Sequence, residues 1–294
     1  MVVFGVAFSI LAVVLAAASF LLFFRVSGKT FDSAGVAIHY TDQGQGVPVV
    51  LVHGFGVHSD INWRWNGCIR RLRRRGYRVI AMDVRGHGRS GKPHDPKEYG
   101  VALSDDIVRL MDHLGIDKAH IAGYSMGGFI VLKTVERHPG RLLSGIIGAA
   151  GWGFLDESYQ GLLQEIRDTI EQHRRFDPLT HWLDLNKRAP WLNCFLANRF
   201  LRSINDVDAI VNVFRTFDAF AVEEEALRRN TVPTLTLVGD RDGIRETSDR
   251  LPGLMACHEL VYIPGGDHIT TILNPRFMSH MLAFLDRNSP PCST

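Results

Sequence analysis

The residues best suited to covalent chemistry are Gly123-Tyr124-Ser125-Met126-Gly127, which stand between a short apolar run and a predicted helix. The run 118–124 has β-strand character, and residues 129–136 have helical character. A Gly-x-Ser-x-Gly pentapeptide at a strand-to-helix turn is typical of a nucleophile elbow. Glycine permits so tight a turn, because a Cβ would collide with neighbouring backbone. Ser125 would then lie at a helix N-terminus, where free N–H groups favour negative charge.

A nucleophilic serine needs a neighbouring base, because its hydroxyl is a weak nucleophile at neutral pH. The chain offers thirteen histidines. His268 follows a predicted strand that ends at Ile263, in a loop that begins Pro264-Gly265-Gly266-Asp267. Functional sites of open α/β sheets lie at the C-terminal edge of the strands. We therefore predict that His268 is the general base for Ser125.

Composition and isolated motifs exclude several other functions. Lys and Arg (33) nearly balance Asp and Glu (31), so no overall charge selects nucleic acid as a partner. The four cysteines include no Cys-x-x-Cys pair, which argues against a zinc knuckle or a thioredoxin-type site. Residues 86–91 match Gly-x-Gly-x-x-Gly, but Pro93 and Pro96 follow and cannot open a helix, so we reject a dinucleotide site.

The elements that position these residues alternate along the 294-residue chain, which is long enough for one large domain with an insertion. Such alternation of strand and helix predicts right-handed crossovers and a mostly parallel sheet. From Gly151 to about Asn230 the pattern breaks into helical stretches rich in Trp and Phe. The predicted strands are 31–42, 47–52, 77–83, 118–124, 143–150, 234–238 and 258–263. The predicted helices are 61–75, 101–114, 129–136, 157–175, 206–217, 219–229 and 278–285.

Five motifs in a fixed order together resemble the α/β-hydrolase superfamily. They resemble especially its cofactor-free branch, which holds carboxylesterases, lipases, C–C bond hydrolases and haloperoxidase-like perhydrolases. The resemblance runs from about Phe31 to Asp286 and implies an α/β-hydrolase fold with a helical cap inserted after the strand at 143–150. The implied units are the core (31–151 and 231–287), the cap (152–230) and a flexible tail (288–294). The motifs are His53-Gly54-Phe55-Gly56, Asp-x-Arg-Gly-x-Gly-x-Ser from Asp83, Gly-x-Ser-x-Gly, Gly-x-x-Asp at 239–242 and Gly-x-x-His at 265–268.

The same resemblance implies the other parts of the site. Asp242, the second acid of Gly239-Asp240-Arg241-Asp242, would orient His268, whereas Asp240 would structure the loop or cap a helix. The backbone N–H groups of Phe55 and Met126 would form an oxyanion hole. The resemblance implies neither a metal nor a cofactor.

We predict a serine hydrolase that cleaves small carboxylic esters, favouring lipophilic ones, through an acyl-serine intermediate. Epoxide hydrolases and haloalkane dehalogenases of this fold use Asp where this chain has Ser125, which favours acyl transfer. Tyr124 and Trp152 are the predicted pocket residues. The alternatives are a C–C bond hydrolase or a perhydrolase on the same triad, or a non-catalytic hydrolase-like protein that binds a ligand. The oligomeric state and any pairing of the cysteines stay open.

The N-terminal segment predicts a membrane association. Residues 1–24 carry no charge, and a helix over them would span roughly 36 Å at about 1.5 Å per residue, enough to cross a bilayer core. We predict a single-pass anchor, because no Lys or Arg precedes the run and the run exceeds the usual length of a signal peptide. The alternative is a signal peptide cleaved near 16–18, which would give a secreted or periplasmic protein. The flanking Arg25 and Lys29 weakly favour a cytosolic catalytic domain.

Overall fold

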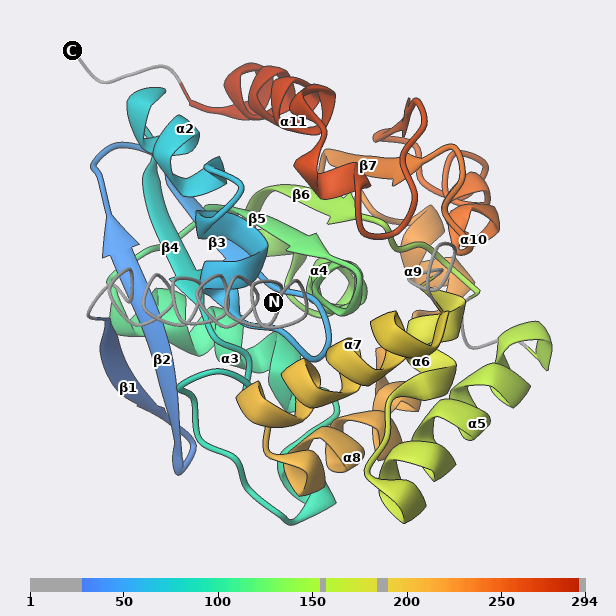
Figure 1. The fold of residues 1–294 in the computed structure, drawn as a ribbon. Helices are drawn as coiled ribbons and strands as arrows, with labels where there is room; N and C mark the ends of the chain where they lie inside the picture. The colour runs from blue at the N-terminus through green and yellow to red at the C-terminus, as the bar shows by residue number, and fades with distance from the viewer. Residues whose placement is uncertain (1–27, 154–156, 184–189, 291–294) are drawn as a thin grey trace, which may run out of the picture.

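The computed structural model describes residues 28–153, 157–183 and 190–290, and in these ranges eight strands form one sheet (Figure 1). Its strand order is β1-β2-β4-β3-β5-β6-β7-β8. The pairs β1/β2 and β2/β4 are antiparallel, and all others are parallel. The prediction of a mostly parallel α/β sheet is therefore confirmed. The strands are β1 (Lys29–Ser33), β2 (Val36–Gln43), β3 (Pro48–Val52), β4 (Arg78–Met82), β5 (Ala119–Tyr124), β6 (Leu142–Gly148), β7 (Thr234–Gly239) and β8 (His258–Ile263).

Helices cover both faces of the sheet. On one face, α3 (Ala102–His113) and α4 (Met126–Arg137) pack against alternate residues of the central strands. On the other face, α2 (Cys68–Arg74) and α11 (Pro275–Asn288) pack against the remaining residues of those strands. Every residue from Val49 to Val52 is consequently buried, as the continuous apolar run predicts for a parallel strand.

Two predicted elements divide in the structure. The predicted helix at 61–75 is a short π-helix (Asp60–Arg64) followed by α2, because Gly67 between them takes a left-handed φ of 78°. The Asn66 side chain accepts the backbone N–H of Cys68 at 3.0 Å and so starts the second helix. The predicted strand at 31–42 is the hairpin of β1 and β2, turned by Ala34 and Gly35 at φ 53° and 87°.

Helices fill the chain between β6 and β7, and the described residues of that stretch contain no strand. These helices share an apolar core of their own, with Ile166, Phe176, Ile210 and Phe214 among its members. Figure 1 shows α5 to α8 grouped at one side of the sheet. We propose residues 152–230 as the cap and 31–151 with 231–287 as the core. The helices are α5 (Glu157–His173), α6 (Asp177–Trp182), α7 (Pro190–Ile204), α8 (Val207–Arg215) and α9 (Glu224–Arg228), and α10 (Arg245–Asp249) follows β7.

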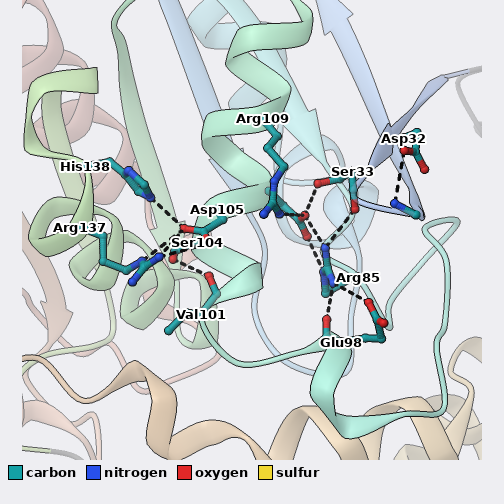
Figure 2. Close-up of polar contacts among 12 residues, drawn as sticks. Asp32, Ser33, Arg85, Glu98, Val101, Ser104, Asp105, Arg109, Arg137 and His138 are labelled. Carbon is teal, nitrogen blue, oxygen red and sulfur yellow. Dashed lines mark hydrogen bonds and ion pairs between the residues drawn. The ribbon is translucent and has the colours of Figure 1, made fainter.

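Arg85 of the Asp-x-Arg-Gly-x-Gly-x-Ser motif forms a buried ion pair that links the loop after β4 to β1 and α3 (Figure 2). Arg85 donates from Nε and Nη2 to the two carboxylate oxygens of Asp106 on α3, at 2.7 and 2.6 Å. The Ser33 hydroxyl donates to the same carboxylate, and Arg85 also donates to the Glu98 carbonyl oxygen. Because both charges are almost fully buried, this Arg has a structural rather than a substrate-binding place.

The structure does not support the prediction of a membrane-anchored chain. In the ranges that the structure describes, no helix has both the length and the apolar character needed to cross a membrane. The predicted anchor, residues 1–24, lies outside the described residues, as do residues 291–294 of the predicted tail.

Candidate active site

Ser125 stands between β5 and α4 in a backbone conformation that side chains rarely adopt, with φ 54° and ψ −119°. The flanking glycines make this turn possible. A Cβ on Gly123 would lie 2.0 Å from the carbonyl oxygen of Gly127, and one on Gly127 would lie 2.3 Å from that of Val52. The Gly-x-Ser-x-Gly pattern therefore reflects backbone-to-backbone approaches that leave no room for a side chain.

Three side chains from three loops meet at the C-terminal edge of the sheet. His268, in the loop after β8, places Nε2 2.9 Å from the Oγ of Ser125. Its Nδ1 lies 3.0 and 3.1 Å from the two carboxylate oxygens of Asp242, in the loop after β7. The Asp242 carboxylate is fully buried, and the imidazole is 8% exposed. With Nδ1–H donating to Asp242, Nε2 is free to accept the proton of the serine hydroxyl.

The two acids of the Gly-x-x-Asp motif have different surroundings. The exposed Asp240 accepts the backbone N–H of Gly265 at 2.8 Å and so fixes the loop that leads to His268. The buried Asp242 accepts the backbone N–H of Ile244 at 3.1 Å, which fixes the carboxylate facing His268. The structure therefore brings Asp242, and not Asp240, to the imidazole.

The His53–Gly56 loop after β3 lies directly against the serine. A Cβ on Gly54 would lie 3.4 Å from the Cβ of Ser125. The backbone N–H of Gly54 donates to the Oδ1 of Asn62 at 2.6 Å, which ties the loop to the helix that follows it. Within the described residues, the backbone N–H groups of Phe55 and Met126 donate to no other protein group. Both are thus available to an anion that forms beside Ser125.

Comparison with known proteins places this geometry in a family. Residues 47–275 match the family model described as alpha/beta hydrolase fold. The chain belongs to the alpha/beta hydrolase family. A non-heme haloperoxidase from Rhodococcus erythropolis is 40% identical over 276 residues, which cover 86% of this chain and 97% of that protein.

Solved structures agree with the assignment. A meta-cleavage product hydrolase from Pseudomonas fluorescens IP01 is 27% identical with a TM-score of 0.69, covering 89% of this chain and 98% of that one. A thermophilic esterase from Thermogutta terrifontis has a TM-score of 0.70 at 22% identity, covering 90% and 99%, and supports the fold alone. The family model, the haloperoxidase and the meta-cleavage product hydrolase together identify the chain as a hydrolase.

A cavity in this hydrolase opens beside Ser125, between the sheet edge and the helices that follow β6. Besides Ser125, every side chain that lines it is apolar or aromatic, so its wall offers a substrate no ionised group. Residues of α5, α6 and α8 contribute about half of this wall. The lining residues are Phe55, Met126, Phe129, Leu162, Leu163, Ile166, Leu179, Trp182, Phe214, Phe217 and Ile244.

Tyr124 and Trp152, predicted as pocket residues, are not among the residues that line this cavity. The buried Tyr124 hydroxyl donates to the backbone carbonyl of His268 at 2.8 Å, which fixes the histidine loop from below. Burial, followed by the charge of Asp242, raises the pKa of Tyr124 well above its usual value near 10, so the hydroxyl stays a donor. Trp152 donates from Nε1 to the carbonyl oxygen of Val222 at 2.8 Å.

Two further histidines are buried and have structural places: His53, which begins the His53–Gly56 loop, and His87, which packs against it. His53 donates from Nδ1 to the Gly54 carbonyl and accepts the Val84 backbone N–H on Nε2, at 2.8 and 2.9 Å. Burial lowers the pKa of His53 to about 4 and that of His87 to about 3. Both imidazoles are therefore neutral at pH 7. The histidine that contacts the serine is His268.

One cluster in the described part of the chain has the ligand types for a cation. His94, Asp206 and Asp208 bring ligand atoms within 4.8 Å of one another, near the start of α8. His94 already contacts Asp206 at 3.1 Å, and Arg174 pairs with Asp208 at 2.5 Å. None of the three lines the cavity beside Ser125, so we give the cluster no part in this site.

Two residues that support the site have no distinguishing signal in the sequence. Asn62 accepts the Gly54 N–H, and no motif marks it. The indole of Trp182 lies 5.2 Å from the imidazole of His268, measured between ring centroids. Trp182 is one of several aromatic residues in the insertion, and only the tertiary structure separates it from the others.

Proposed function

We propose that this hydrolase cleaves uncharged, lipophilic carboxylic esters through an acyl-serine intermediate. The observation that carries the proposal is the chain of contacts from the Oγ of Ser125 through His268 to Asp242, with distances of 2.9 and 3.0 Å. A hydroxyl in such a chain can be deprotonated as it attacks a carbonyl carbon.

The proposed reaction has two stages. His268 takes the Ser125 proton while Oγ attacks the ester carbonyl, and Asp242 balances the charge of the imidazolium. The oxyanion of the tetrahedral intermediate accepts the N–H groups of Phe55 and Met126. His268 then gives its proton to the departing alcohol. A water molecule, deprotonated by His268, attacks the acyl-serine. The bond between the acyl carbon and Oγ then breaks, His268 returns its proton to Oγ, and the carboxylic acid leaves.

The cavity supports the substrate class. A carboxylate or ammonium on the substrate would lose its hydration there without gaining a charged partner, since no ionised side chain lines the wall. A neutral acyl chain loses nothing comparable and gains about 25 cal/mol for each Å² of apolar surface that it buries.

Perhydrolysis is the second candidate, and the 40% identity to a non-heme haloperoxidase favours it. In that reaction hydrogen peroxide, rather than water, attacks the acyl-serine and releases a peracid. The same three residues serve both reactions, so the two candidates differ only in the second nucleophile.

The test compares the wild-type chain with Ser125→Ala and with a matched control, Ser279→Ala, at an exposed serine of α11. A fluorophosphonate probe measures activation of the serine, and p-nitrophenyl esters from acetate to decanoate measure turnover. We expect the wild type and Ser279→Ala to react and Ser125→Ala to lose both activities. Absence of labelling in folded wild-type protein would refute the proposal. Labelling without ester turnover would instead favour a C–C bond substrate.

Two additions sharpen the assignment. A p-nitrophenyl hemisuccinate, which carries a carboxylate, should turn over much more slowly than the butyrate ester. A faster hemisuccinate would contradict the uncharged substrate class. Acetate with hydrogen peroxide should give peracid if the second candidate holds.

A further inference from the structure

Trp182, in the helical insertion, packs its ring against the imidazole of His268. It ends α6, lines the cavity, and lies with its ring centroid 5.2 Å from that of His268 at an interplanar angle of 54°. A Cβ on Gly243, the residue after Asp242, would lie 3.6 Å from the indole Nε1. The indole therefore lies beside both the imidazole and Gly243, the residue that follows the carboxylate partner.

Trp182 packs against the apolar cluster of the core and against that of the insertion, and the insertion holds the helix that carries it. Asn198 of α7 accepts the backbone N–H of Phe176 at the start of α6, and its amide donates to the Asp177 carboxylate at 3.1 Å. Leu179 and Phe176 belong to the apolar cluster shared by α5, α6 and α8. A movement of these helices would therefore carry the indole away from His268.

This contact can affect the reaction, because His268 becomes positively charged in each stage of the proposed mechanism. The face of an indole attracts a cation within about 6 Å of its centroid. The other groups around the imidazole are the Asp242 carboxylate on Nδ1 and the Ser125 hydroxyl on Nε2. The neighbouring Asp267 carboxylate accepts the backbone N–H groups of Ile269 and Thr270. The Tyr124 ring lies 5.9 Å from the imidazole between centroids, farther than the indole, and its hydroxyl donates to the His268 carbonyl oxygen.

We infer that Trp182 is a positioning residue that stabilises the imidazolium form of His268. The proton affinity and orientation of this general base then depend on the position of α6. This inference rests on the proposed function for its catalytic consequence, but the imidazolium itself can be measured without any substrate. The indole also narrows the volume in which the imidazole can rotate, so it keeps Nε2 directed at Ser125.

The experiment follows the His268 imidazole by NMR through a pH titration, with the resonance assigned by its loss in His268→Gln. The variants are Trp182→Leu, which removes the ring, and Trp182→Phe, which keeps a smaller one. The control is Phe214→Leu, which lines the same cavity but contacts Phe55 instead of His268. Removing the indole should lower the midpoint of this titration, because the imidazolium loses the attraction of the ring. Trp182→Phe should give a smaller shift, and Phe214→Leu should give none.

Kinetics provide the second readout on the same proteins. We expect kcat/KM of Trp182→Leu to fall about 3- to 30-fold near neutral pH, and its acid limb to move to lower pH with the NMR midpoint. An unchanged midpoint in Trp182→Leu, or an equal shift in Phe214→Leu, would overturn the inference. The two proposals fail separately. Unlabelled wild-type protein refutes the esterase, whereas labelled wild type with unshifted Trp182 variants refutes only this role of Trp182.

Discussion

The substitution Asp242→Asn tests whether the buried carboxylate controls the proton on His268. Both carboxylate oxygens lie within 3.1 Å of Nδ1, and one of them also accepts the Ile244 backbone N–H. Asparagine has nearly the same shape, so its amide oxygen can keep the Ile244 contact and turn the NH₂ group toward Nδ1. An NH₂ there favours the tautomer with hydrogen on Nε2, which cannot accept the serine proton.

The expected loss is large because two effects act together. The substitution presents the wrong tautomer to Ser125 and removes the negative charge that balances the imidazolium. In Ser-His-Asp sites of other folds such a change lowers kcat by about 10⁴, which corresponds to about 5 kcal/mol of transition-state stabilisation. We expect a loss of about 10³ to 10⁴ in kcat here, with KM changed little, because Asp242 is not among the residues that line the cavity.

Asp240→Asn is the matched control, two residues away in the same loop. Its amide oxygen can still accept the Gly265 N–H, and the side chain is exposed, so kcat should stay within about threefold of the wild type. The assay is p-nitrophenyl butyrate turnover together with the rate of fluorophosphonate labelling, and thermal unfolding of each variant verifies its fold. The reasoning is refuted if Asp242→Asn keeps more than about a tenth of the activity, or if Asp240→Asn loses as much.

Two further predictions concern the loop beside the serine. Asn62→Ala removes the acceptor of the Gly54 N–H, held at 2.6 Å, and we expect a stability loss of about 1–3 kcal/mol and a roughly tenfold lower kcat. Wild-type turnover by this variant would show that Asn62 does not hold the loop. Burial lowers the pKa of His53 to about 4 and that of His87 to about 3, so the unfolded chain binds protons first as the pH falls below about 6.5. The free energy of unfolding measured in urea should be about 2 kcal/mol lower per histidine at pH 5 than at pH 7. In His87→Phe this difference between the two pH values should be smaller by about 2 kcal/mol, because one of the two histidines is gone.

The parts of the fold that sequence predicted well are those specified by local pattern. Residues 258–263 form β8 with the predicted bounds, and the predicted helix at 101–114 is α3 within one residue at each end. Apolar runs buried on both faces and an amphipathic helix need no knowledge of distant partners. The elbow at Ser125 was equally predictable, because glycines on both sides of it record close backbone approaches.

The parts that escaped prediction depend on contacts between distant segments. None of the predicted helices covers α6 or α7, although both are regular helices in the structure. The α7 side chains Phe195, Leu196 and Phe200 are exposed, so its apolar residues do not follow the buried stripe expected of a packed helix. In the same way, Asn62 and Trp182 take their places from partners 8 and 86 residues away (62 − 54 and 268 − 182), which no local pattern records.

The contacts of the insertion with the core suggest how substrate binding affects the residues that carry out the reaction. Phe214 of α8 contacts the ring of Phe55 at a centroid distance of 4.4 Å, and Phe55 carries one of the two proposed oxyanion donors. Trp182 of α6 contacts His268, the proposed base. Both aromatic residues also line the cavity, so an acyl chain that fills it touches the side chains that hold each half of the machinery. Binding of an unreactive acyl chain can therefore stabilise the positions of the oxyanion donor and of the base together. We expect longer acyl chains to raise kcat as well as lower KM.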